Sequence, residues 1–186
     1  MNVLIAGVGG QGVVLASKLI AQCAVQRNEL ARTAETIGMA QRGGSVVSHV
    51  RTGYDAYSPL IPKGSADMLI GFEPSEAVRC LAWLRHGGTV VVSDRGVFTS
   101  NSPDYKPELM IEFLRLQPHI KTLEIVSADK VFDELGSYRS LNVAMLGVAA
   151  RTGNLGATTD ELASAMDSLM SAKNAGLAKP ALNLYI

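Results

Sequence analysis

The stretch Val3-Leu-Ile-Ala-Gly-Val-Gly-Gly-Gln-Gly12 decides the fold of this chain. It begins with four consecutive apolar residues, which is typical of a strand buried on both faces of a parallel sheet. Residues 13–27 follow with apolar side chains at three- and four-residue spacing, a pattern that predicts a helix. A strand, a glycine turn and a helix in this order indicate the opening of a β-α-β unit.

Outward from this opening, strand-like and helix-like segments alternate along the chain. Strands are predicted at 29–35, 45–51, 67–71, 89–93 and 122–126, and helices at 73–85, 108–116, 129–135, 140–151 and 158–173. The helix at 73–85 is expected to stop at Gly87 and Gly88. This alternation predicts a three-layer, Rossmann-like α/β fold. Because residues 45–62 interrupt the alternation, we expect its sheet to be mixed, although mostly parallel. No linker or repeat divides residues 1–186, which predicts one domain, and 172–186 is interpreted as a tail that docks on a partner.

Composition excludes several classes of function. Seventeen Lys and Arg balance seventeen Asp and Glu, which argues against binding to nucleic acid or to an anionic membrane surface. The chain opens directly into a strand without a basic, signal-like segment, and it has no apolar run near the roughly 18–20 residues of a membrane span, so we expect a cytoplasmic protein. Cys23 and Cys80 lie in separate predicted helices, so we expect buried thiols, no iron–sulfur cluster and no metal site.

Residues Gly7 to Gly12, which we call the glycine loop, have the Gly-x-Gly-x-x-Gly spacing of a dinucleotide-binding fingerprint. Gly7 permits the tight turn, Gly9 allows backbone to approach a phosphate, and Gly12 allows the helix to pack closely on the strand. The helix also offers free N–H groups to an anion. Glu35 could serve as the acidic residue that binds a ribose. Three interpretations remain open: a free-standing NAD(P)- or flavin-binding oxidoreductase, a turn without a ligand, or a site for another phosphate-bearing group or a partner's active site.

A second glycine-rich segment, Gly38-Met-Ala-Gln-Arg-Gly-Gly-Ser45, carries three glycines around Arg42. The guanidinium group of Arg42 suits a carboxylate or a phosphate, so we favour a functional or interface role for this residue. The alternative is an ion pair with Glu35 or Glu73. His49, on the strand that follows, is interpreted as a hydrogen-bonded structural histidine.

These two loops, together with Asn142-Val-Ala-Met-Leu-Gly147, resemble the gamma-type subunit family of 2-oxoacid:ferredoxin oxidoreductases. The stretch from Ala34 to Arg51, followed by Ser58-Pro-Leu-Ile-Pro62, is similar to the indolepyruvate ferredoxin oxidoreductase beta-subunit branch of that family. The resemblance covers essentially the whole chain, and the motifs in this order are highly specific.

The resemblance implies a subunit, inactive alone, of an enzyme that oxidatively decarboxylates an arylpyruvate to an acyl-CoA and passes two electrons to ferredoxin. Thiamine diphosphate and the iron–sulfur clusters would belong to a large partner subunit, and this chain would bind no cofactor tightly but help to form a shared coenzyme A cleft. The resemblance nominates no catalytic residue. The binding residues that it nominates are Gly7, Gly9, Gly10, Gln11, Gly12, Gly38, Arg42, Gly43, Gly44 and Asn142. For Asn142 a buried amide that ties two loops together is an equal alternative. A homodimer of the isolated chain is a further expectation, and a scaffold without a ligand remains the alternative role.

Overall fold

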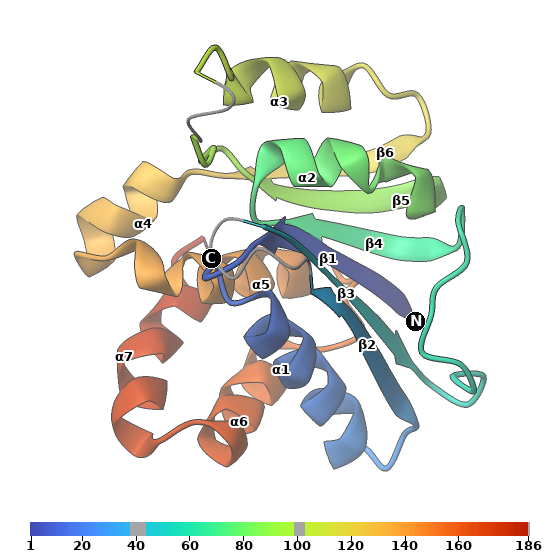
Figure 1. Cartoon of the computed structure of the whole chain (residues 1–186). Helices are drawn as coiled ribbons and strands as arrows, with labels where there is room; N and C mark the ends of the chain where they lie inside the picture. The colour runs from blue at the N-terminus through green and yellow to red at the C-terminus, as the bar shows by residue number, and fades with distance from the viewer. Residues whose placement is uncertain (38–43, 99–102, 186) are drawn as a thin grey trace.

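A computed structural model describes residues 1–37, 44–98 and 103–185, and it contains a six-stranded sheet with helices on both faces (Figure 1). The strands are β1 (Asn2–Val8), β2 (Ala31–Ile37), β3 (Ser45–Thr52), β4 (Ala66–Gly71), β5 (Leu84–Ser93) and β6 (Ile120–Val126), in the order β2-β3-β1-β4-β5-β6. Strands β1, β4, β5 and β6 are parallel, whereas β3 runs antiparallel to both β1 and β2. The predicted α/β fold with a mixed, mostly parallel sheet is confirmed.

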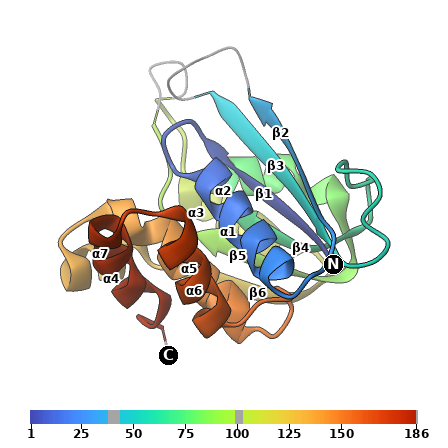
Figure 2. The ribbon, with the colours of Figure 1, turned by 90° about the horizontal axis from the view of Figure 1, so that it is seen from below.

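The helices divide between the two faces of the sheet. They are α1 (Val13–Gln26), α2 (Pro74–Arg79), α3 (Pro107–Arg115), α4 (Ala128–Leu135), α5 (Leu141–Arg151), α6 (Thr159–Leu169) and α7 (Ala172–Leu182), with 3-10 turns at Leu81–Trp83 and Tyr138–Ser140. Helices α1, α5, α6 and α7 lie on one face of the sheet (Figure 2), where they build one apolar core together with α4. Helices α2 and α3 build the core on the other face. In the described part of the chain no helix has the length and apolar character needed to span a membrane.

The central strand β1 shows why its sequence is apolar at consecutive positions. Val3 and Ile5 enter the core under α1, while Leu4 and Ala6 enter the core under α2. All four side chains are fully buried, because alternate residues of a strand point to opposite faces and both faces are covered here.

The prediction of a helix at 73–85 is wrong for the second half of that range. Helix α2 ends at Arg79, and Leu84 already pairs with Ala66 of β4 as the first residue of β5. Gly87 and Gly88 therefore lie inside a strand, where the register with β6 shifts and Gly87 takes a φ of 73°. Pairing with two parallel neighbours overrides the local helical pattern, and the glycines accommodate a bulge instead of ending a helix.

The chain after residue 169 also differs from the prediction. The predicted helix 158–173 is interrupted at Met170, which is extended, and the Ser171 hydroxyl accepts a hydrogen bond from Asn174 N–H (3.4 Å) as it caps α7. Helix α7 packs on α5 and α6 and buries Ala175, Ala178, Ala181 and Leu182. The described part of this segment is therefore a helix that completes the chain's own core, and its docking on a partner stays a prediction.

Candidate functional site

The chain leaves β1 and β4, two parallel neighbours, toward opposite faces of the sheet. Helix α1 follows β1 on one face, and α2 follows β4 on the other. Ligands of open α/β sheets bind outside the carboxyl ends of the strands at such a switch point. A pocket of about 270 Å³ lies there, and we call it the switch-point pocket; its lining is Gly10, Gln11, Phe72, Arg95, Val97, Tyr138, Arg139, Leu141 and Asn142.

The glycine loop is held by its own glutamine. Gln11 Oε1 accepts from Val8 N–H (2.8 Å), and its Nε2 donates to the Phe72 carbonyl (3.1 Å). The side chain therefore joins the end of β1 to the end of β4. A Cβ at Gly7 would lie 2.7 Å from Gln11 Oε1, so this glycine leaves room for the amide. Gln11 thus stabilises the loop and also lines the switch-point pocket, while its role in binding stays a prediction.

The other glycines of the loop meet different surroundings. Gly10 and Gly12 have φ of 95° and 84°, a region that side chains rarely adopt. Gly12 packs against the amide of Asn142, and a Cβ there would overlap Asn142 Nδ2. Asn142 is buried, and its Oδ1 accepts from Val143 N–H (2.8 Å). The structure thus brings Asn142 to the glycine loop, as the sequence motifs suggested, while its role in binding stays a prediction.

Two arginines that the sequence motifs did not single out complete the pocket. Arg95 follows β5, and Arg139 belongs to the turn before α5. The Arg95 guanidinium lies 3.5 Å from the centre of the Tyr138 ring, and the Tyr138 hydroxyl donates to Asp129 (3.1 Å). Among the described lining residues there are two guanidinium groups and no carboxylate. Together with the N-terminus of α1, they make the pocket suited to an anion.

A buried carboxylate fixes the segment that carries Arg95. Glu73 is 1% exposed and accepts hydrogen bonds from the backbone N–H of Glu76 (3.0 Å) and Val97 (3.3 Å) and from the hydroxyls of Ser75 (2.5 Å) and Tyr105 (2.5 Å). Four donors compensate the cost of burying the charge. Burial, and then the contact with Glu73, raises the pKa of Tyr105, so its hydroxyl keeps its proton. Sequence reasoning missed this anchor, because its partners lie up to 32 residues away.

The second glycine-rich segment returns to the same end of the sheet. Gly9 N–H donates to the Gly44 carbonyl (2.9 Å), so the described end of this segment touches the glycine loop. The Ser45 hydroxyl, one residue further, donates to buried Glu76 (2.6 Å). Gly38, Arg42 and Gly43 lie outside the described residues, so their predicted roles stay predictions.

Glu35 does not lie where a ribose-binding carboxylate is needed. Strand β3 separates β2 from β1, which places β2 about 10 Å from β1 at the usual strand spacing. Glu35 instead accepts from the hydroxyl of buried Ser17 on α1 (3.3 Å). The topology therefore argues against a dinucleotide held by the glycine loop and Glu35.

Other reactive side chains have structural partners. His49 Nδ1 accepts from Ile61 N–H (3.1 Å), which confirms a hydrogen-bonded structural histidine. Asp94 follows β5 and accepts from Ala128 N–H (2.8 Å) at the start of α4. Cys23 and Cys80 are buried, and burial raises the pKa of each thiol to about 11, which keeps both unreactive. Within residues 1–37, 44–98 and 103–185, no three His, Cys, Asp or Glu side chains lie together as metal ligands would.

The fold and the site define a doubly wound α/β protein with an anion pocket at its switch point. The pyruvate ferredoxin/flavodoxin oxidoreductase family model matches residues 2–183. The chain belongs to this family.

Individual relatives agree with this assignment. The chain is 37% identical over 154 residues to indolepyruvate oxidoreductase subunit IorB of Archaeoglobus fulgidus, an alignment that covers 80% of this chain and 75% of the relative. It is 33% identical over 174 residues to the protein of the same name from Methanothermobacter thermautotrophicus (91% and 88%). The crystal structure of pyruvate oxidoreductase subunit PORC from Thermotoga maritima shares the fold, with a TM-score of 0.72 at 18% identity over 100% of this chain and 94% of that one.

Proposed function

We propose that this chain is the small, cluster-free subunit of a cytoplasmic, thiamine-dependent oxidoreductase that converts an arylpyruvate such as indolepyruvate to an acyl-CoA and reduces ferredoxin. Family membership makes the chain a subunit of a 2-oxoacid oxidoreductase with an iron–sulfur protein as acceptor. The indolepyruvate relatives support the substrate class. A large partner subunit would carry thiamine diphosphate and the clusters, which supply the decarboxylation and the electron transfer.

The observation that carries the role of this chain is the switch-point pocket. Coenzyme A carries phosphate groups, which suit the N-terminus of α1, Arg95 and Arg139. The volume of about 270 Å³ lies below the roughly 300–1,000 Å³ typical of complete ligand sites. The pocket fits a phosphate portion rather than the whole cofactor, as a cleft shared with a partner requires.

The residues of this chain would bind and orient the cofactor. Arg95 and Arg139 would donate to phosphate oxygens, and the ring of Tyr138 would keep the Arg95 guanidinium in one plane. Gln11 holds the loop at the ends of β1 and β4. The described lining contains no Asp, Glu, His or Cys, and the Tyr138 hydroxyl already donates to Asp129, so we assign the pocket binding rather than proton transfer.

Anaerobic purification of the chain from its native source, with co-purifying proteins identified by mass, tests the assembly. We expect a large companion with ferredoxin-type cysteine motifs and coenzyme A-dependent oxidation of indolepyruvate by the complex. A chain that purifies alone, or a complex that does not oxidise arylpyruvates, would contradict the proposal.

Arg139→Gln in the purified complex tests the pocket. We expect the KM for coenzyme A to rise about tenfold with kcat unchanged, because a charge-assisted hydrogen bond to phosphate is lost. Arg139→Lys should recover part of the affinity, and Arg32→Gln, on the exposed strand β2, should change nothing. An unchanged KM in Arg139→Gln would remove the pocket from the coenzyme A cleft.

A further inference from the structure

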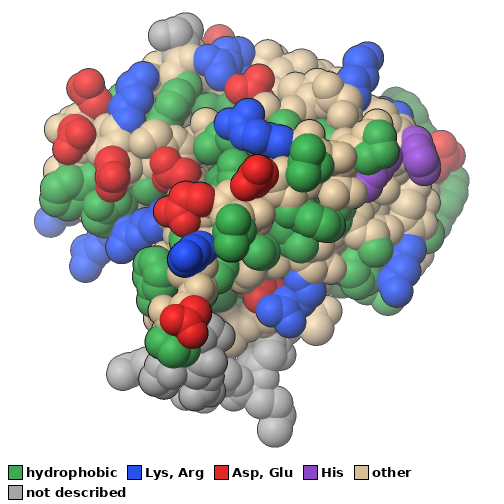
Figure 3. Space-filling model, turned by 90° about the horizontal axis from the view of Figure 1, so that it is seen from above, with side chains coloured by type: hydrophobic (Ala, Val, Ile, Leu, Met, Phe, Trp, Pro, Cys, Tyr) green, Lys and Arg blue, Asp and Glu red, His purple; other side chains and the backbone are tan. Residues whose placement is uncertain are grey.

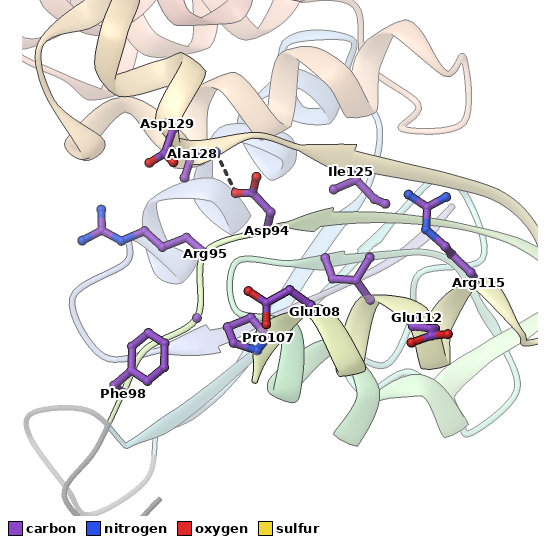
Figure 4. A pocket seen from close by; sticks show the side chains of 12 residues that line it. Asp94, Arg95, Phe98, Pro107, Glu108, Glu112, Arg115, Ile125, Ala128 and Asp129 are labelled. Atoms are coloured by element: carbon purple, nitrogen blue, oxygen red, sulfur yellow. Dashed lines mark hydrogen bonds between the residues drawn. The ribbon is translucent and has the colours of Figure 1, made fainter. Parts of the chain in front are cut away.

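The sheet ends at β6, and the side of this edge strand that faces α3 is hollowed along its length. One hollow of about 860 Å³ lies between α3, the segment that follows β5 (Asp94 to Phe98), the end of β6 and the start of α4 (Figure 4). A second, of about 210 Å³, lies between the end of α3 and the start of β6. Arg115 lines both, so we treat them as one feature, the β6 groove.

The backbone of β6 lies open beside this groove. In the described part of the chain, β6 pairs with β5 alone. An edge strand presents unpaired N–H and C=O groups, which can pair with a strand from another chain. Leu123 and Ile125, two residues apart and therefore on one face of β6, line the groove and are only partly buried. An added strand would find hydrogen-bonding groups on the edge of β6, and its own side chains on the α3 side would pack beside Leu123 and Ile125.

The wall of the groove carries charges without ion pairs. Glu108, Glu112 and Arg115 lie on one face of α3, because they are spaced three and four residues apart. Neither they nor Lys121, at the other end of the groove, form an ion pair with any described residue. The larger hollow has four carboxylates and two guanidinium groups, one of them the Arg95 group already held over Tyr138. This end of the groove is thus suited to a basic side chain.

The outer face of α3 continues the surface of the groove. Leu109, Phe113 and Leu116 are 53%, 45% and 73% exposed and lie at four- and three-residue spacing. On the face of the molecule that contains α3, hydrophobic side chains gather among charged ones (Figure 3). Exposed apolar side chains that gather together and are rimmed by polar groups mark a surface that a partner can cover.

We propose that the β6 groove binds an extended segment of the large subunit, which adds to β6 as a further strand and places a basic side chain against Glu108 and Glu112. This inference rests on the proposed function, because it requires the complex. A second copy of this chain is a poorer occupant, since it would bring two grooves of net negative charge together at the α4 end.

Hydrogen exchange of the wild-type chain, alone and in the purified complex with its large subunit, tests the proposal. We expect amides in 120–126 to exchange at least about tenfold more slowly in the complex, because pairing protects the open edge. Amides of β2, the other edge of the sheet, provide an internal comparison. A complex that leaves 120–126 unprotected overturns the inference and leaves the proposed function intact. Failure to obtain any complex would instead count against the proposed function. Protection of 120–126 that depends on the concentration of the isolated chain would assign the edge to a second copy and overturn the inference.

Charge reversal supplies a second test of the same complex. Glu112→Lys should weaken binding of the large subunit about tenfold, because it opposes the basic side chain of the segment. Asp55→Lys is the matched control, since it changes the net charge equally at an exposed loop outside the groove. Equal affinities of the two variants would overturn the proposed charge match.

Discussion

Gly10 and Gly12 lie two residues apart in one loop, yet an added methyl group would meet different surroundings at each. Both have positive φ, but a Cβ at Gly10 meets nothing within 4 Å, whereas one at Gly12 overlaps the Asn142 amide. We expect Gly10→Ala to lower the free energy of unfolding by about 1 kcal/mol and Gly12→Ala by about 3 kcal/mol in urea denaturation. Asn142→Ala should recover part of the loss in the Gly12→Ala background. Equal losses at the two glycines would show that the Asn142 contact is unimportant.

His49 provides a prediction on pH. Burial lowers the pKa of His49 below its ordinary value of 6.5, so the folded state favours the neutral ring that accepts from Ile61 N–H. The stability it contributes is present above about pH 6.5 and is lost as pH falls through the folded pKa. The free energy of unfolding should therefore fall less steeply between pH 6.5 and 5 in His49→Gln than in the wild type. Equal slopes in the two proteins would contradict this role of His49.

Single residues of the candidate site could be predicted only where they belong to one of the sequence motifs, which include Asn142 as well as the glycine loop. The glycine spacing indicated Gly7 to Gly12 as a turn that can receive a phosphate, and the structure places that turn at the switch point. Arg95 and Arg139 were missed, because β5 and the turn before α5 reach the pocket only through the sheet topology. No local pattern marks such residues.

At the scale of elements, continuous apolar runs predicted the inner strands well. The errors fell where tertiary contacts compete with helical spacing, at Leu84 and at Met170. Ser171 is a favoured N-cap residue, a helix-start signal that could have divided the long helix at the right place. The strand at Leu84 had no comparable local signal, because it depends on pairing with β4.

The contact between α5 and α7 depends on one glycine. A Cβ at Gly147 would overlap the carbonyl of Leu182, which is backbone and cannot rotate away. We expect Gly147→Ala to lower the free energy of unfolding by about 2–3 kcal/mol and to speed hydrogen exchange in α7 more than in α1. Gly176→Ala, inside α7 with nothing within 4 Å of its Cβ, should stabilise the chain by about 0.5–1 kcal/mol. A Gly147→Ala variant as stable as the wild type would mean that α7 can move away from α5 without lowering the free energy of unfolding.

At the scale of the whole molecule, the sequence motifs predicted the family, since they extend over nearly the whole chain. The interruption of the strand–helix alternation at 45–62 predicted the mixed sheet. The β6 groove could not be predicted, because it arises between a helix and a strand that each look ordinary in sequence.

Arg42→Ala belongs to this scale, because its expected effect is on the assembled enzyme. Three glycines surround Arg42 in the sequence, which favours a contact with a partner or ligand over a role in folding. We expect assembly with the large subunit or turnover of the complex to fall, while the thermal midpoint of the isolated chain stays unchanged. Unchanged assembly and turnover would refute an interface role.

The Gln11 bridge between Val8 and Phe72 has a kinetic consequence. A loop held in place by its own side chain keeps its conformation before a ligand arrives, so ligand binding loses little conformational entropy in ordering the loop. Phosphate groups should then enter the pocket in one rapid phase whose rate rises linearly with concentration and slows with added salt, without a later rearrangement step. The loop acts as a rigid receptor rather than a closing clamp.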